Sequence, residues 1–236
     1  MTKKVLQQLK QEMADQSNEA IALSTQRFFK NEIQCIGIKA ADLKLLSRKY
    51  YRLLDKPSKV DVFKLCEILW KSGIQEEAMV ACDWSYRQKK NFLENDLPIF
   101  EKWITKYITN WATCDTFCNH SVGSYIMQYP DSLPKLFAWA KSKNTWMRRA
   151  AAVSLIIPGK RGLFTNEILK IASILLKDPD DMVQKGYGWM LKVSFEKQPD
   201  RIIDFVLQNK QKMPRTALRY AIEKWPANLK IQAMAK

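Results

Sequence analysis

The feature of this sequence that most constrains its fold is a pattern that recurs along its second half. Four short segments can be superimposed there: Trp111–Asp115, Trp146–Arg149, Met182–Lys185 and Thr216–Arg219. Each ends on a polar or ionic residue, and these last residues follow one another at intervals of 34, 36 and 34 positions. Such a period is typical of stacked helix pairs, as in TPR, HEAT and armadillo solenoids. Chance recurrence of charge along amphipathic helices is the alternative.

The remaining sequence also favours helices. Apolar residues recur at helical spacing almost throughout, as in the stripe Val5, Leu6, Leu9 and Met13, and alternating strand-like runs are scarce. Prolines fall between such segments, where helices begin or end. We therefore predict an all-α chain, a HEAT-like or ARM-like helical repeat solenoid that forms a single domain over residues 1–236. In such a stack, equivalent helices line one concave face.

The charge of the chain indicates what that face could bind. Its 39 basic and 24 acidic residues leave a net charge of +15, which favours polyanions such as nucleic acid. We predict a basic groove lined by cations and by an exposed tryptophan: Lys39, Lys44, Trp146, Arg148, Lys185, Arg215 and Arg219. Cations in a row can follow the phosphates of one strand, and indole faces suit sugars or bases.

One pair in the repeat suggests chemistry. Trp111 and Asp115 are four residues apart, so on a helix they share one face. A carboxylate beside an indole suits a sugar that develops positive charge, as in cleavage of a glycosidic bond through an oxocarbenium-like state. The carboxylate can also orient the attacking water. Alternatively, Asp115 is structural and caps a helix or forms an ion pair, for example with Arg149.

Several blocks resemble the bacterial AlkD-type DNA alkylation-repair glycosylases. The resemblance extends from about residue 26 to about residue 224, in the family's order. The blocks are Arg27–Lys30 through Gly37-Ile38, Asn110–Asp115, Asn144–Ala151, Val183–Trp189 and Pro214–Lys224. No single block is specific, but the combination is.

This resemblance implies a HEAT-like solenoid that grips duplex DNA and removes cationic N3- and N7-alkylated purines, as a monofunctional glycosylase without metal or cofactor. The family's catalytic Asp and its paired Trp correspond to Asp115 and Trp111. The active-site Arg corresponds to Arg149, and the second sugar-contacting Trp to Trp189. The resemblance further implies that the damaged base stays in the duplex. The chain departs from the family's usual residues at four positions, which could alter groove shape or lesion preference: Ala112, Asp181, Met182 and Gly186.

The sequence is also compatible with other functions. A non-catalytic HEAT scaffold that binds nucleic acid or an acidic protein is the main alternative, and peripheral membrane binding is disfavoured because the aromatics are spread through the array. Cys114, Cys118 and His120 form a C-x3-C-x-H cluster, but the chain has one histidine and no second cysteine pair at ligand spacing, so we expect no metal. Five cysteines and no recognisable leader favour a reduced, cytoplasmic protein. Nothing in the sequence asks for more than a monomer.

Overall fold

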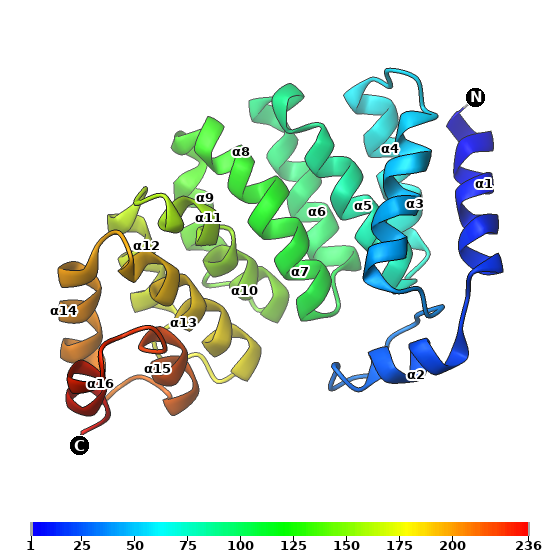
Figure 1. The fold of residues 1–236 in the computed structure, drawn as a ribbon. Coiled ribbons are helices and arrows are strands. Elements are labelled where there is room, and N and C mark those ends of the chain that lie inside the picture. The colour runs from blue at the N-terminus through cyan, green and yellow to red at the C-terminus, as the bar shows by residue number, and fades with distance from the viewer. Residues whose placement is uncertain (1, 236) are drawn as a thin grey trace. The chain divides into compact units, whose positions relative to one another are not determined.

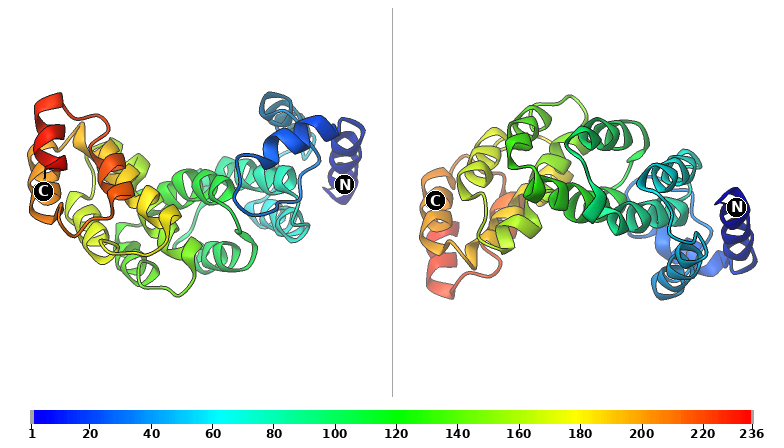
Figure 2. Two further views of the ribbon diagram at one scale, coloured as in Figure 1. Left: turned by 90° about the horizontal axis from the view of Figure 1, so that it is seen from below. Right: turned by 90° about the horizontal axis from the view of Figure 1, so that it is seen from above.

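The computed structural model of the chain describes residues 2–235, which form helices joined by short connections (Figure 1). Figure 2 shows the same helices from below and from above. No strand occurs in this range, where the only extended pairing is an isolated parallel bridge between Gln34 and Ile74. The predicted all-α class is confirmed.

Helix packing divides the chain into two compact units, Met1–Phe117 and Cys118–Lys236. The two units are described separately below. That the whole chain acts as one domain with a concave basic groove stays a prediction.

The first unit is built from helices that pack mainly on the next helix but one in the sequence. They are α1 (Thr2–Asp15), α2 (Glu19–Gln26), α3 (Ala40–Arg52), α4 (Lys59–Lys71), α5 (Gln75–Arg87), the short turns η1 (Lys89–Asn91) and η2 (Glu94–Asp96), α6 (Leu97–Tyr107) and α7 (Trp111–Phe117). Within this unit α5 packs against α3, α4 and α7 (Figure 1). Rings from α4, α6 and α7 form its core, with Phe100 and Phe117 fully buried. Burial of each such ring stabilises the folded state by roughly 2 kcal/mol.

The second unit is organised around one long helix. Its elements are η3 (Cys118–Val122), α8 (Gly123–Gln128), η4 (Pro130–Ser132), α9 (Leu133–Trp139), α10 (Thr145–Val153), α11 (Ile156–Lys160), α12 (Thr165–Ile174), α13 (Asp181–Phe195), α14 (Pro199–Asn209), α15 (Arg215–Ala221) and α16 (Ala227–Met234). Helix α13 packs against α10, α11, α12, α14 and α15. Its residues Val183, Tyr187 and Met190 are fully buried, so α13 supplies much of this unit's core.

The repeat predicted from the second half is confirmed, and it extends into the first half. Six helices begin at regular intervals of 35, 36, 34, 36 and 34 residues: α3, α5, α7, α10, α13 and α15. The recurring positions Asp115, Arg149, Lys185 and Arg219 are each the fifth residue of their helix. The charge pattern therefore marked successive helices of one repeat.

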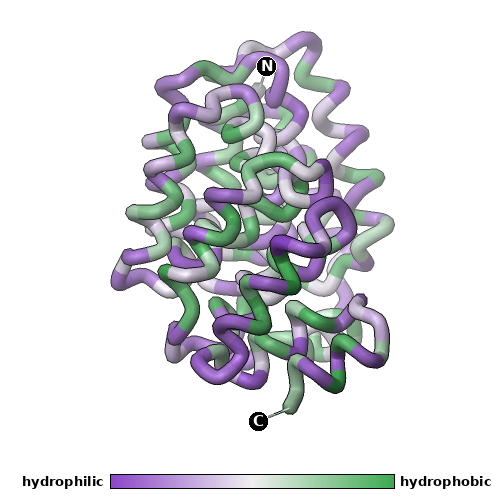
Figure 3. Tube along the Cα trace, turned by 90° about the vertical axis from the view of Figure 1, so that its left-hand side faces the viewer, coloured by the Kyte–Doolittle hydropathy of each residue, from purple (hydrophilic) through white to green (hydrophobic). Residues whose placement is uncertain are grey.

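The helices are amphipathic, as their spacing of apolar residues predicts. Hydrophobic and hydrophilic stretches alternate along the trace (Figure 3). The stripe Val5, Leu6, Leu9 and Met13 on α1 is buried. Within residues 2–235, no helix combines the length and the apolar character needed to cross a membrane.

Candidate functional site

Asn110 fixes the start of α7, which carries two of the predicted site residues. Its side-chain oxygen accepts the backbone N–H of Thr113 at 3.1 Å, as in a helix cap. Its amide nitrogen donates to the side-chain oxygen of Gln75, the first residue of α5, at 2.9 Å. The first turn of α7 is thereby tied to α5, and the residues that follow Asn110 have a fixed orientation.

Trp111 is the first residue of α7 and lies at the surface of the first unit. Its side chain is 36% exposed. Its indole N–H donates to the backbone carbonyl of Phe28 at 3.2 Å, and the ring of Phe29 stacks on the indole with 5.5 Å between centroids and 20° between planes. Two contacts from one loop therefore hold a ring that is partly open to solvent.

The tryptophans fall into a buried group and an accessible group. Five of the eight tryptophans are at most 3% exposed: Trp70, Trp84, Trp103, Trp139 and Trp225. The three tryptophans of the predicted groove and site are not buried, since Trp146 and Trp189 are of intermediate exposure and Trp111 is exposed. These three rings are accessible to a ligand in a way that the core rings are not.

Asp115 follows Trp111 by one turn on α7 and is half-buried. At this spacing the carboxylate and the indole project from the same side of the helix. The carboxylate and the aromatic ring that the sequence predicts as a pair therefore lie on one side of α7.

Arg149 and Trp189 lie on two helices of the second unit that pack together, α10 and α13. Arg149 is 5% exposed, and its guanidinium donates to the backbone carbonyl of Met182 in the first turn of α13. The half-buried Trp189 lies about two turns further along α13. Arg149 is thus a buried residue anchored to the neighbouring repeat.

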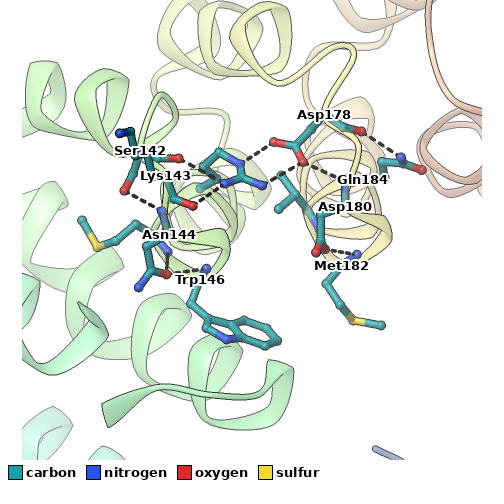
Figure 4. Close-up of polar contacts among 11 residues, drawn as sticks. Ser142, Lys143, Asn144, Trp146, Asp178, Asp180, Met182 and Gln184 are labelled. Carbon is teal, nitrogen blue, oxygen red and sulfur yellow. Dashed lines mark hydrogen bonds and ion pairs between the residues drawn. The ribbon is translucent and has the colours of Figure 1, made fainter. Parts of the chain in front are cut away.

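Arg148, although adjacent to Arg149, has different surroundings. Its guanidinium forms a two-pronged ion pair with the buried carboxylate of Asp178, at 2.6 and 3.3 Å, and donates to the carbonyls of Ser142 and Lys143 at 3.1 and 3.2 Å (Figure 4). These contacts join the segment that precedes α10 to the segment that precedes α13. Arg148 therefore has a structural role that its charge alone does not reveal.

The caps of α10 and α13 extend this network. Asn144 accepts the backbone N–H groups of Trp146 and Met147, and Asp180 accepts those of Met182 and Val183 (Figure 4). The residues nearest to each helix start are thereby fixed, and they include Trp146.

The other predicted groove residues fall into two groups. Lys39, Lys44, Arg215 and Arg219 are exposed. Lys185 is half-buried and pairs with Asp181 at 3.0 Å, one turn earlier on α13. The exposed residues are accessible to phosphates, whereas Lys185 already has a carboxylate partner.

The structure places Trp111 and Asp115 on α7 of the first unit, and Arg149 and Trp189 on the packed helices α10 and α13 of the second. The meeting of all four residues at one substrate stays a prediction. Sequence reasoning missed the contacts of Phe28 and Phe29 with Trp111. These residues lie more than eighty positions away in the chain, and no spacing rule connects them.

The cysteine and histidine cluster has mixed surroundings. Cys114 and Cys118 are fully buried, and His120 is exposed. Among residues 2–235, no group of three or more His, Cys, Asp or Glu side chains is arranged to hold a metal ion.

Comparison with known proteins identifies the family. The model of the family described as DNA alkylation repair enzyme matches residues 9–225. A protein from Enterococcus faecalis described as a predicted DNA alkylation repair enzyme shares the fold, with a TM-score of 0.80 and 19% identity over 90% of this chain and 98% of that one. AlkD2 from Streptococcus mutans matches with a TM-score of 0.65 and 18% identity, over 96% of this chain and 100% of that one. No curated protein sequence matches. The chain belongs to the DNA alkylation repair enzyme family.

Proposed function

We propose that this protein is a DNA N-glycosylase that excises cationic N3- and N7-alkylated purines, such as 3-methyladenine and 7-methylguanine, from duplex DNA. The observation that carries the proposal is the pairing of Asp115 with Trp111 on α7, in a member of a DNA alkylation repair family. A protein that only bound DNA would gain nothing from a carboxylate facing phosphates.

The chemistry follows from the charge of the lesion. An alkylated purine that carries a positive charge is already a good leaving group, so breaking its glycosidic bond needs little protonation by an acid. The sugar left behind develops oxocarbenium character, and the carboxylate of Asp115 stabilises this positive charge. The same carboxylate orients the water that attacks the sugar. The indole of Trp111 packs on the deoxyribose and attracts the cationic sugar through its ring face. Neither step requires a metal or a cofactor.

Residues of the second unit would act on the DNA beside the lesion. Trp189 packs on the same deoxyribose, and Arg149 holds the adjacent phosphate from a position anchored by its bond to the Met182 carbonyl. Exposed cations of the repeat helices bind the phosphates further along: Lys39, Lys44, Arg215 and Arg219. We propose that the protein does this as a cytoplasmic monomer.

The test is identification of the product. Duplex DNA treated with a methylating agent is incubated with the protein, and the soluble fraction is analysed for free purines. Free 3-methyladenine or 7-methylguanine, with an abasic site left in the strand, supports the proposal. Salt-sensitive binding of the duplex without release of any base would contradict it and favour a non-catalytic HEAT scaffold.

A further inference from the structure

The part of the loop that contacts Trp111 is closed by the side chain of Gln26. The loop leaves α2 after Gln26 and has no helical structure before α3 begins at Ala40. Its far end is fixed by α5: the backbone N–H of Gln75 donates to the carbonyl of Gln34 at 2.7 Å, and the Glu76 carboxylate accepts the N–H groups of residues 36–38. Between these ends, at Phe28 and Phe29, the loop contacts the indole.

The amide of Gln26 bonds to three backbone groups of this loop. Its oxygen accepts the N–H of Ile33 at 2.9 Å. Its nitrogen donates to the carbonyl of Asn31 at 3.0 Å and, more weakly, to that of Phe29 at 3.5 Å. A single amide, which is both donor and acceptor, therefore closes the loop across residues 29–33.

The loop begins as a turn on the end of α2, in which the N–H groups of Phe28 and Phe29 donate to the carbonyls of Thr25 and Gln26 at 3.1 and 3.0 Å. The side chain of Phe28 is 72% exposed, so apolar burial contributes little at that position. The Phe28 carbonyl must nevertheless stay in place to accept the Trp111 indole N–H, and Phe29 must stay parallel to the indole. The conformation of the backbone between Phe28 and Ile33 thus decides where both contacts fall.

We propose that Gln26 is a positioning residue for Trp111: its amide fixes the loop so that the Phe28 carbonyl and the Phe29 ring set the orientation of the indole. The proposal rests on the function proposed above, because the orientation of Trp111 matters for catalysis only if its indole packs on the sugar. Small displacements of positioned groups slow catalysis strongly.

The variant that isolates this role is Gln26→Glu. A glutamate has nearly the same shape and still accepts the Ile33 N–H, but its ionised carboxylate cannot donate to the carbonyls of Asn31 and Phe29. Gln26→Ala removes all three bonds. Ser24→Ala changes an exposed residue of the same helix and is the matched control. Phe29→Leu removes the stacking and leaves Gln26 intact.

Trp111 can be observed separately from its seven companions. The protein is labelled with 5-fluorotryptophan, and the 19F resonance of Trp111 is assigned by its loss in Trp111→Phe. We expect Gln26→Glu, Gln26→Ala and Phe29→Leu to move the Trp111 resonance and increase its solvent exposure, while those of the core tryptophans stay in place. Ser24→Ala should leave all eight unchanged. Base release by the Gln26 variants should slow by about tenfold, in kcat more than in KM.

Three results would overturn the proposal. The first is an unmoved Trp111 resonance in both Gln26 variants, and the second is movement of all eight resonances, which would mean general loss of structure. The third applies if the wild type is active: the Trp111 resonance shifts in the Gln26 variants, but these variants release base at the wild-type rate. If the wild type releases no base, the proposed function fails by itself, and the Trp111 resonance still decides whether Gln26 positions the indole.

Discussion

Gly186 on α13 leaves the space that the side chain of Arg149 on α10 occupies. A Cβ atom at position 186 would lie 3.3 Å from Cγ of Arg149 and 3.5 Å from its Nη1. Two residues further along α13, a Cβ at Gly188 would lie 2.7 Å from both the Ala217 carbonyl oxygen and Cβ of Tyr220. Gly186 therefore makes room for an arginine side chain, and Gly188 for the close approach of α15.

This difference predicts that alanine at position 186 affects base release, whereas alanine at position 188 affects stability. In Gly186→Ala, Arg149 must shift by a few tenths of an ångström, and the loss of fit is offset by the roughly 1 kcal/mol that alanine adds to a helix. Base release should slow by about tenfold with little change in the free energy of unfolding. Gly188→Ala should lower the free energy of unfolding by about 1–3 kcal/mol, because backbone of α15 cannot yield easily. Denaturant midpoints and single-turnover release measure both; the same stability loss in the two variants would contradict this account.

The buried ion pair of Arg148 predicts a structural effect. Arg148→Ala leaves the Asp178 carboxylate, whose side chain is 5% exposed, without its charged partner. The free energy of unfolding should fall by about 3 kcal/mol. Urea denaturation measures this loss, with Arg215→Ala as the control, since Arg215 is exposed and its loss should change stability by less than about 0.5 kcal/mol. Equal, small losses in both variants would show that the ion pair does not stabilise the second unit.

The exposed cations predict the salt dependence of DNA binding. Each phosphate contact that is lost should reduce the slope of log K against log salt by about 0.9. We therefore expect Arg215→Ala and Arg219→Ala each to flatten the slope for an undamaged duplex by roughly one unit. Fluorescence anisotropy between low and moderate salt measures the slope. An unchanged slope in both variants would place the phosphate contacts elsewhere.

The helical repeat shows how far the sequence predicts the structure. The helical repeat was predictable in the second half because a polar or ionic residue stands fifth in each repeat helix there. In the first half the fifth residue is Lys44 in α3 but the apolar Met79 in α5. The charge pattern is interrupted there, so it does not reveal the repeat in this half. The helix starts continue the period because packing of neighbouring helices, not the charge, sets it.

The site was predictable to a similar extent. The spacing of Trp111 and Asp115 is local, and helix geometry alone places them together. The contrast between Arg148 and Arg149 depends on Asp178 and Met182, which are about thirty residues away and come close only through packing. No periodicity in the sequence distinguishes the arginine that holds the fold from its neighbour.

Glu67 on α4 predicts an acid-dependent change in stability. Its carboxylate accepts hydrogen bonds from Trp103, Tyr107 and Lys102, each at 2.6 Å. Burial alone would raise the pKa of Glu67, but these donors together outweigh it and lower the pKa below the ordinary value of 4.5. A lowered pKa contributes stability above the unfolded pKa, and this contribution is lost as the pH falls through the folded pKa.

The variant Glu67→Gln removes the ionisation. At pH 7 its free energy of unfolding should be lower than that of the wild type by about 2 kcal/mol, and the difference should shrink as the pH falls below about 4.5. Urea midpoints measured from pH 7 downward test this. A difference that stayed constant with pH would mean that the charge of Glu67 does not contribute.

Asp115→Asn tests the central claim most directly. Single-turnover release of 3-methyladenine and 7-methylguanine from methylated duplex is compared for wild type, Asp115→Asn and Asp131→Asn, an exposed aspartate that controls for the loss of one negative charge. We predict that Asp115→Asn binds the duplex at least as tightly as wild type but releases base at least about 100-fold more slowly. Asp131→Asn should behave as wild type. Equal release by Asp115→Asn and wild type would contradict the role assigned to this carboxylate.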